Sequence, residues 1–188
     1  MIHIKCEELK LNINELIARL GGTMDEVSLS VAKRLLKELQ HLIEPCFCFI
    51  EAPVNQQNRI CDFGFTKVES LALSKTLEGY KNACLLAVTL GHEADRFLKA
   101  KSLVSPFEQF VADAVASTLI EAACDYAVTK LPFKTGRRFS PGYSDLDLSF
   151  QEPLLNHLKT FCGCNICLNS SNLMIPTKSI TAVMGITE

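Results

Sequence analysis

Arg138-Phe-Ser-Pro-Gly-Tyr143 and, near the chain end, Leu173-Met-Ile-Pro-Thr-Lys-Ser-Ile-Thr-Ala-Val183 are the two stretches from which the fold can be inferred. In the first, Pro141 fixes its own φ and pushes Ser140 towards extended geometry, which predicts a tight turn. The second alternates in polarity and is rich in β-branched residues, which predicts one or two strands.

The turn also carries side chains that suit a ligand. Gly142 has no Cβ, so the backbone can come close to a bound molecule. Arg138 offers a planar fork of donors that matches a carboxylate, and Tyr143 adds an aromatic face and a hydroxyl. These residues predict a binding site for a small zwitterionic or nucleoside-bearing ligand. The alternative is a surface turn with a solvated arginine.

Helical and strand patterns alternate along the 188 residues without the regular order of a parallel sheet. This favours an α+β fold with a mainly antiparallel sheet. We expect one domain over residues 1–188, with a helical N-terminal part (1–45) and a core (46–188). The predicted helices are 12–20, 25–43, 74–80, 92–100, 106–129 and 148–161, and the predicted strands are 1–6, 46–50, 60–63, 83–90 and one or two within 173–186.

Two elements are predicted most clearly. Residues 83–90 form an apolar run closed by Gly91, which is typical of a buried strand. The helix 106–129 begins with Ser105 as its N-cap, and its apolar stripe includes Phe107 and Phe110.

Strand 46–50 is expected to pair with strand 60–63 across a polar turn at 53–58. The pairing would make a hairpin.

The charge and hydropathy patterns exclude several classes of function. The formal net charge is −2, so the chain has no electrostatic footprint for nucleic acid. No apolar run reaches the length of a membrane span, and the N-terminus lacks the pattern of a signal peptide. We therefore expect a cytoplasmic protein that binds neither nucleic acid nor membrane.

The nine cysteines are an odd number, which argues against a disulfide framework. Three of them, Cys162, Cys164 and Cys167, follow a C-x-C-x-x-C spacing that can supply ligands to zinc or to an iron–sulfur cluster. The other interpretation is that they are ordinary small residues at a helix–strand junction, with Ile166 and Leu168 facing inward.

The two opening stretches, taken together, resemble the activation domain of cobalamin-dependent methionine synthase, in its stand-alone form. Further matches are Ile13-Asn-Glu-Leu-Ile-Ala-Arg-Leu-Gly-Gly22, Ala87-Val-Thr-Leu-Gly91 and Ala112-Asp-Ala-Val115. The Arg-x-x-Pro-Gly-Tyr element is fairly specific and the Pro-x-x-Ser tail moderately so. The resemblance covers most of the chain, and it implies a twisted antiparallel sheet flanked by helices.

The resemblance also implies a function. In that family the domain binds S-adenosylmethionine and presents its methyl group to cob(II)alamin, while a reduced flavodoxin- or ferredoxin-like protein supplies an electron. Methylcobalamin is restored, and with it methionine biosynthesis. Such a module is a component of a methyltransferase and has no turnover alone. The alternatives are activation of a different corrinoid methyltransferase, or a cysteine-ligated metal or redox module.

Site residues follow from the resemblance position by position. Arg138 would bind the S-adenosylmethionine carboxylate, and Ser140 would bring its backbone to the ligand. Gly142 and Tyr143 would close the turn around it. Asp113 stands where the family carries a glutamate that faces the ligand.

One departure from the family and one absence complete these expectations. Met184 occupies the position at which the family can offer a ligand-binding tyrosine. Nothing in the chain resembles the homocysteine, folate or cobalamin modules. The expected cofactor is S-adenosylmethionine, and cobalamin would enter only through a partner, a corrinoid-binding methionine synthase that lacks its own activation domain.

Overall fold

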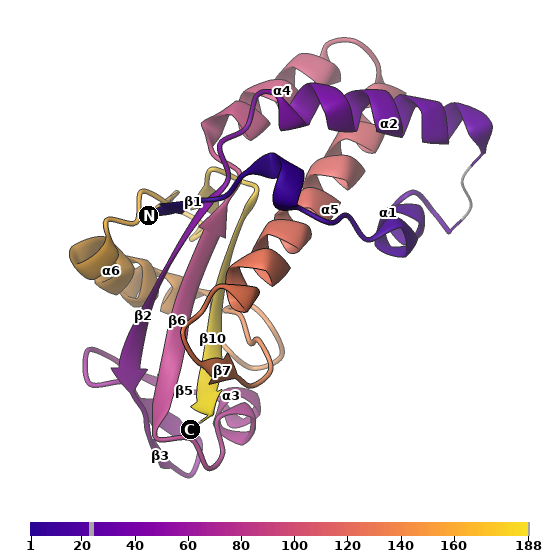
Figure 1. The fold of residues 1–188 in the computed structure, drawn as a ribbon. Coiled ribbons are helices and arrows are strands. Elements are labelled where there is room, and N and C mark those ends of the chain that lie inside the picture. The colour runs from indigo at the N-terminus through magenta and orange to yellow at the C-terminus, as the bar shows by residue number, and fades with distance from the viewer. Residues whose placement is uncertain (23–24, 188) are drawn as a thin grey trace.

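A central five-stranded sheet organises the computed structural model, which describes residues 1–22 and 25–187 (Figure 1). The strand order is β1-β2-β6-β10-β7, and every neighbouring pair is antiparallel. This agrees with the α+β class expected from the sequence. The strands are β1 (Ile2–His3), β2 (Cys46–Pro53), β6 (Asn82–Thr89), β10 (Ser179–Thr187) and β7 (Lys134–Thr135).

Strand β6 lies at the centre of the sheet because both of its faces are apolar. All its residues from Ala83 to Thr89 are buried. Their side chains alternate between two hydrophobic clusters, one on each face of the sheet. A strand with two apolar faces must be covered on both sides, so the predicted strand 83–90 is also the one that determines the layering.

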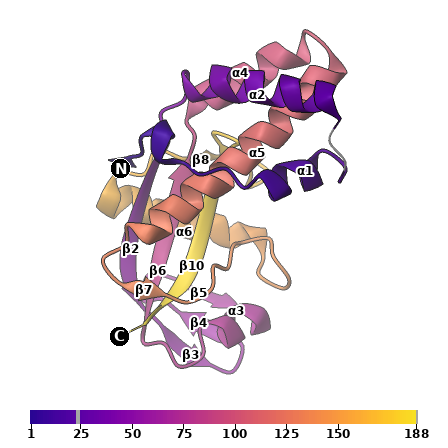
Figure 2. The ribbon, with the colours of Figure 1, turned by 45° about the vertical axis from the view of Figure 1, so that its right-hand side comes forward.

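Helices cover the sheet on both faces (Figures 1 and 2). Helix α5 crosses one face and packs against α1, α2 and α4, while α6 lies on the other face, against β2 and β6. We call the hydrophobic cluster beneath α5 the α5-side core and the cluster beneath α6 the α6-side core. The helices are α1 (Ile13–Arg19), α2 (Glu26–Gln40), α3 (Leu71–Thr76), α4 (His92–Ser102), α5 (Pro106–Thr129) and α6 (Gln151–Cys162), with 3₁₀ turns η1 (Cys6–Glu8) and η2 (Leu148–Phe150).

Helix α5 begins where the sequence predicts. The Ser105 hydroxyl accepts a hydrogen bond from the Glu108 amide at 3.0 Å, and Pro106 occupies the first turn. Phe107 and Phe110 were expected in the buried stripe, but they are 44% and 50% exposed. The reason is position: the first turns of α5 lie beyond the end of the sheet, beside α2 and α4 (Figure 1).

The predicted hairpin between residues 46–50 and 60–63 is wrong. Strand β2 pairs with β1 and β6, and it continues as far as Pro53. The expected turn instead contains β3 (Asn55–Gln57), which pairs with β4 (Ile60–Asp62) in a separate sheet completed by β5 (Lys67–Glu69). Pairing with the long apolar β6 buries far more of β2 than a short hairpin would.

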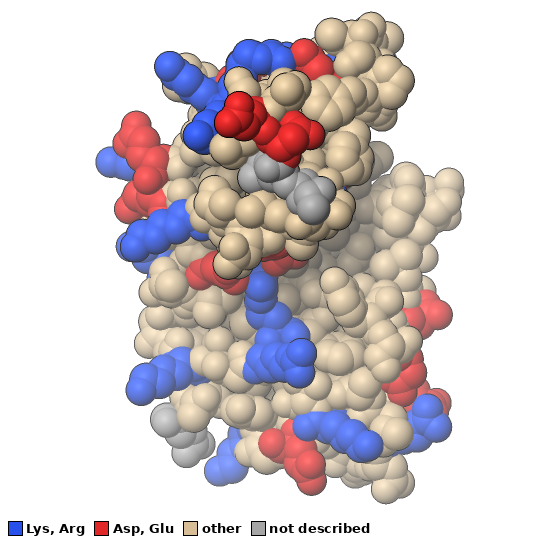
Figure 3. Space-filling view, turned by 90° about the vertical axis from the view of Figure 1, so that its right-hand side faces the viewer, with Lys and Arg blue, Asp and Glu red and all other residues tan. Residues whose placement is uncertain are grey.

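A two-stranded sheet of β8 (Cys167–Leu168) and β9 (Met174–Ile175) leads into β10. Among the described residues, no helix is both long enough and apolar enough to cross a membrane. The face shown in Figure 3 carries lysine and arginine interspersed with aspartate and glutamate.

Candidate functional site

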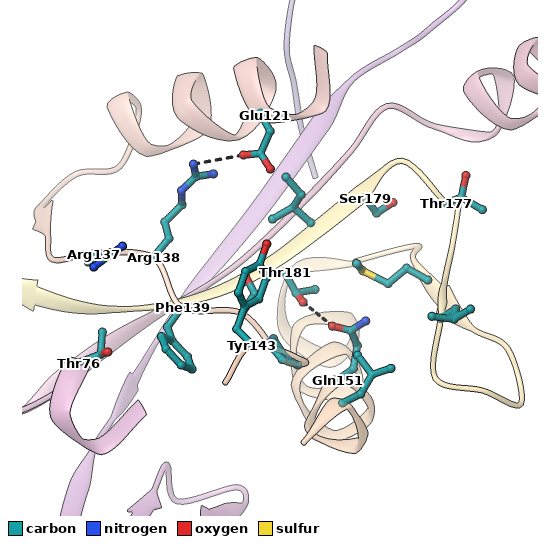
Figure 4. A pocket seen from close by; sticks show the side chains of 16 residues that line it. Thr76, Glu121, Arg137, Arg138, Phe139, Tyr143, Gln151, Thr177, Ser179 and Thr181 are labelled. Carbon is teal, nitrogen blue, oxygen red and sulfur yellow. Dashed lines mark hydrogen bonds and ion pairs between the residues drawn. The ribbon is translucent and has the colours of Figure 1, made fainter. Parts of the chain in front are cut away.

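A cavity of about 740 Å³ opens at the edge of the central sheet, between the start of β10 and the loop that precedes α6 (Figure 4). It is lined by residues 137–141 and 143, by the first three residues of β10 and by the segment around β9. Single residues of α3, α5, η2 and α6 complete the lining. The volume lies within the range typical of small-molecule sites.

The loop with the Arg138 motif is held against β10 by main-chain hydrogen bonds. The Phe139 amide donates to the Val183 carbonyl at 3.0 Å, and the Val183 amide donates to the Phe139 carbonyl at 2.8 Å. Phe139 packs against the α6-side core. Because neighbouring side chains alternate in extended backbone, Arg138 is directed to the opposite side, towards α5 (Figure 4).

The turn itself depends on Gly142. Its φ is +87°, a conformation that favours glycine, and its amide donates to the Leu146 carbonyl at 2.9 Å. The Tyr143 amide donates to the Ser140 carbonyl at 3.2 Å, which closes the turn. Ser140 and Tyr143 line the cavity, whereas Gly142 shapes the loop without lining it.

Arg138 is held by two carboxylates of α5. Its Nη2 lies 3.3 Å from Glu121 Oε2 and 3.0 Å from Asp125 Oδ1. Glu121 lines the cavity together with Arg138, although sequence reasoning did not select it. The sequence feature that could have identified Glu121 is its i, i+4 spacing from Asp125. This spacing places both carboxylates on one helix face, where they can share a cationic partner.

Burial and neighbouring charges both act on this arginine. Burial lowers the pKa of the guanidinium, but Cys124, Asp125 and Glu121 raise it, and the net shift is upward. Burial also raises the pKa of the Cys124 thiol to about 11, against the opposing effect of Arg138. The site therefore presents a permanent cation beside a neutral thiol.

Asp113, also expected at the ligand, does not line the cavity. Its Oδ1 lies 2.8 Å from Lys178 Nζ, which also contacts the Ser117 hydroxyl at 2.9 Å. Lys178 immediately precedes β10, so Asp113 of α5 holds the chain between two cavity-lining residues, Thr177 and Ser179.

The same segment is held by α4. The Thr177 amide lies 3.1 Å from both carboxylate oxygens of Asp95, and the Thr177 hydroxyl also donates to Asp95. Inside the strand, the Ser179 hydroxyl contacts Thr89 Oγ1 at 2.8 Å and the Pro176 carbonyl at 2.7 Å. One wall of the cavity is thus fixed by polar contacts to three other elements of the chain.

Met184, the expected counterpart of a ligand-binding tyrosine, lies elsewhere. It is fully buried in the α5-side core, and it does not line the cavity. The cavity-facing positions of β10 are at its start, Ser179 to Thr181.

The cysteines do not assemble as metal ligands. Cys164 is buried, Cys162 is half-buried and Cys167 is exposed. Among the described residues, no group of three or more histidine, cysteine, aspartate or glutamate side chains is placed to hold a metal ion. Instead, the neighbouring Cys48 thiol lowers the pKa of the Cys164 thiol below its ordinary value. Of the two residues expected to face inward, Ile166 is buried and Leu168 half-buried.

Comparison with known proteins identifies the fold. The crystal structure of the MetH reactivation domain bound to AdoHcy superposes with a TM-score of 0.72 over 98% of this chain and 77% of that chain, at 15% sequence identity. The chain has the fold of the MetH reactivation domain. This confirms the fold that the sequence resemblance implied. No family model matches the chain, and no curated protein sequence matches it.

Proposed function

We propose that this chain is an S-adenosylmethionine-binding reactivation module that supports the reductive methylation of cob(II)alamin to methylcobalamin in trans. The observation that carries the proposal is the Arg138 loop, which lines a ligand-sized cavity in a reactivation-domain fold. The similar MetH domain was solved with AdoHcy, which is S-adenosylmethionine without its transferable methyl group.

The residues of the cavity match the chemistry of that ligand. Arg138 suits the carboxylate of the amino acid end, because a guanidinium can bind it with two parallel hydrogen bonds. Glu121, which lies beside Arg138 in the wall, suits the ammonium group of the same end. Tyr143 offers an aromatic face to the nucleoside, while Ser140 brings its backbone to the cavity.

The proposed reaction requires little acid–base catalysis by this chain. The sulfonium methyl of the ligand is already activated, so the protein mainly binds and orients it. Gly142 contributes by forming the turn and Asp113 by holding Lys178 at the opposite wall. An unfavourable one-electron reduction is drawn forward by an effectively irreversible methyl transfer.

The proposed partners follow from this role. Cobalamin would be held by a corrinoid-binding methionine synthase that lacks its own activation domain, and the electron would come from a flavodoxin- or ferredoxin-like protein. The chain would contribute to methionine biosynthesis as a component of a methyltransferase, with no turnover alone. If only a different corrinoid methyltransferase responds, the binding chemistry stands and the partner changes.

Calorimetric titration with S-adenosylmethionine tests the binding step. Arg138→Ala should weaken binding at least about tenfold, because it removes charge-assisted hydrogen bonds. Arg96→Ala, which breaks an exposed ion pair on α4, is the matched control and should leave binding unchanged. Undiminished affinity in Arg138→Ala would contradict the assignment.

A spectroscopic assay tests the reaction. With reduced donor, S-adenosylmethionine and a cob(II)alamin-loaded methionine synthase lacking an activation domain, the chain should accelerate the appearance of the methylcobalamin spectrum. Arg138→Ala should remove the acceleration. The absence of any acceleration by the unmodified chain would leave only a binding role.

A further inference from the structure

Two nearly inaccessible polar side chains lie in the wall of the cavity. Gln151, the first residue of α6, is 4% exposed, and Thr181 of β10 is 1% exposed, yet both line the cavity. A buried amide is costly unless its donors and acceptors are paired. The pairing of Gln151 therefore decides what it can still offer to a ligand.

The orientation of the Gln151 amide is determined by its two partners. The Thr181 hydroxyl donates to Gln151 Oε1 at 2.7 Å (Figure 4). Gln151 Nε2 donates to the Asn172 carbonyl at 3.4 Å. Rotating the amide by half a turn would place its oxygen against the Asn172 carbonyl, where two acceptors would face each other. The oxygen must therefore face Thr181.

These contacts use only half of the amide. Its oxygen accepts two hydrogen bonds and its nitrogen donates two, and the partners Thr181 and Asn172 take one of each. One donor and one acceptor of Gln151 remain in the wall of the cavity. Adenine has the complementary pair, because its 6-amino donor lies next to a ring-nitrogen acceptor, the pattern that glutamine reads on adenine in nucleic acids.

We propose that Gln151 is the residue that makes the cavity specific for adenine over other purines; the inference rests on the proposed function. The position of Gln151 fits this role. It begins α6 on one side of the sheet, whereas Arg138 is paired to α5 on the other side. In Figure 4, Tyr143 lies between the two. A ligand with its carboxylate at Arg138 can therefore extend past the tyrosine ring to place its base at Gln151.

The test compares two ligands that differ only in the base. AdoHcy carries adenine, whereas S-inosylhomocysteine carries hypoxanthine, in which an oxo group replaces the 6-amino donor. The unmodified chain should bind AdoHcy about tenfold or more tightly, in line with the discrimination of a good bidentate contact. Gln151→Leu should bind both ligands with similar affinity. Gln40→Leu, at the end of α2, is the matched control and should keep the preference.

A second variant keeps the test decisive if Gln151→Leu does not fold. Gln151→Glu preserves the side-chain size and an acceptor for Thr181, but it can donate neither to a ring nitrogen nor to the Asn172 carbonyl. Its preference should shift towards S-inosylhomocysteine, whose ring N–H can donate to the carboxylate.

Each result bears on the proposal. Equal loss of affinity for both ligands, with their ratio preserved, would mean that Gln151 is only structural and would overturn the inference. So would an unmodified chain that binds both ligands equally well. An unmodified chain that fails to bind AdoHcy at all would overturn the proposed function, and this inference with it.

Discussion

Lys178 Nζ lies 2.8 Å from Asp113 Oδ1, so the residue just before β10 is tied to the N-terminal half of α5. The lysine is only 15% exposed, whereas the aspartate is 59% exposed. Asp113 does not line the cavity, but the contact holds Lys178, which lies between the cavity-lining residues Thr177 and Ser179.

Asp113→Asn should therefore have a small effect on ligand binding. An ion pair with one exposed partner contributes less than about 1 kcal/mol, so affinity should fall by no more than about fivefold. Titration calorimetry of this variant beside Arg138→Ala measures the difference. A loss as large as that of Arg138→Ala would show that Asp113 contacts the ligand directly.

Asp145 ties the loop after the Arg138 turn to α3. Its carboxylate accepts hydrogen bonds from the Ser70 hydroxyl at 2.6 Å and from the amides of Leu71 and Ala72 at 2.7 and 3.1 Å. The Ser70 hydrogen bond and these amides hold the pKa of Asp145 below its usual value. A group whose pKa is lower in the folded state stabilises the fold above its unfolded pKa, about 3.9, and loses this effect as the pH falls through its folded value.

Asp145→Asn should thus lower the melting temperature at neutral pH, and the difference from the unmodified chain should shrink below about pH 4. The matched control is Asp147→Asn, because Asp147 has a lowered pKa too but bonds only to Ser149, two residues away. Asp145→Asn should also weaken ligand binding, whereas Asp147→Asn should not. A pH-independent difference in melting temperature would contradict this account.

Met184→Tyr should destabilise the chain without tightening ligand binding. Met184 has no exposed surface, and the residue paired with it on the neighbouring strand β6 is the buried Cys84. Extra volume in a packed core costs about 1–3 kcal/mol. Denaturant unfolding measures the loss in the free energy of unfolding. The control is Ile186→Tyr, at a half-buried position of the same strand, which should lose less of this free energy. Tighter S-adenosylmethionine binding in Met184→Tyr would mean that position 184 reaches the ligand.

The nine thiols should react in order of exposure. Cys167 is exposed, Cys6 and Cys162 are half-buried, and the remaining six are buried. Burial raises the pKa of Cys84 to about 12. This thiol should therefore react slowly for two reasons: the reagent cannot reach it, and it stays protonated at neutral pH. Mass spectrometry after brief alkylation should find Cys167 labelled first and Cys84 only after unfolding. Rapid labelling of Cys84 in the folded chain would contradict the strand arrangement.

Sequence reasoning was most accurate for elements that local chemistry specifies. Helix α5 begins at its Ser105 cap and its Pro106, and β6 lies within one residue of the apolar run that predicted it. Pro141 and Gly142 indicated the turn, and Gly142 has the positive φ that such a turn requires. Each of these features depends on residues close together in the chain.

The site was only partly predictable. Arg138, Ser140 and Tyr143 of the motif line the cavity, but Glu121 and Gln151 were not selected from the sequence. Glutamate and glutamine on helices are usually solvated, so neither stands out by residue type. These two residues reach the cavity because a loop and a strand from distant parts of the chain pack against their helices. Local sequence patterns carry no information about such packing.

The amino-acid sequence by itself determined where the turn, the central strand and the long helix form, because backbone preference and apolar periodicity act over a few residues. Only the tertiary structure decided that β2 pairs with β6, that Met184 faces the core and that Asp113 pairs with Lys178. Strand side chains alternate with a period of two, so the face that a residue presents depends on pairing with distant strands. Ion pairs between segments depend on the same long-range packing.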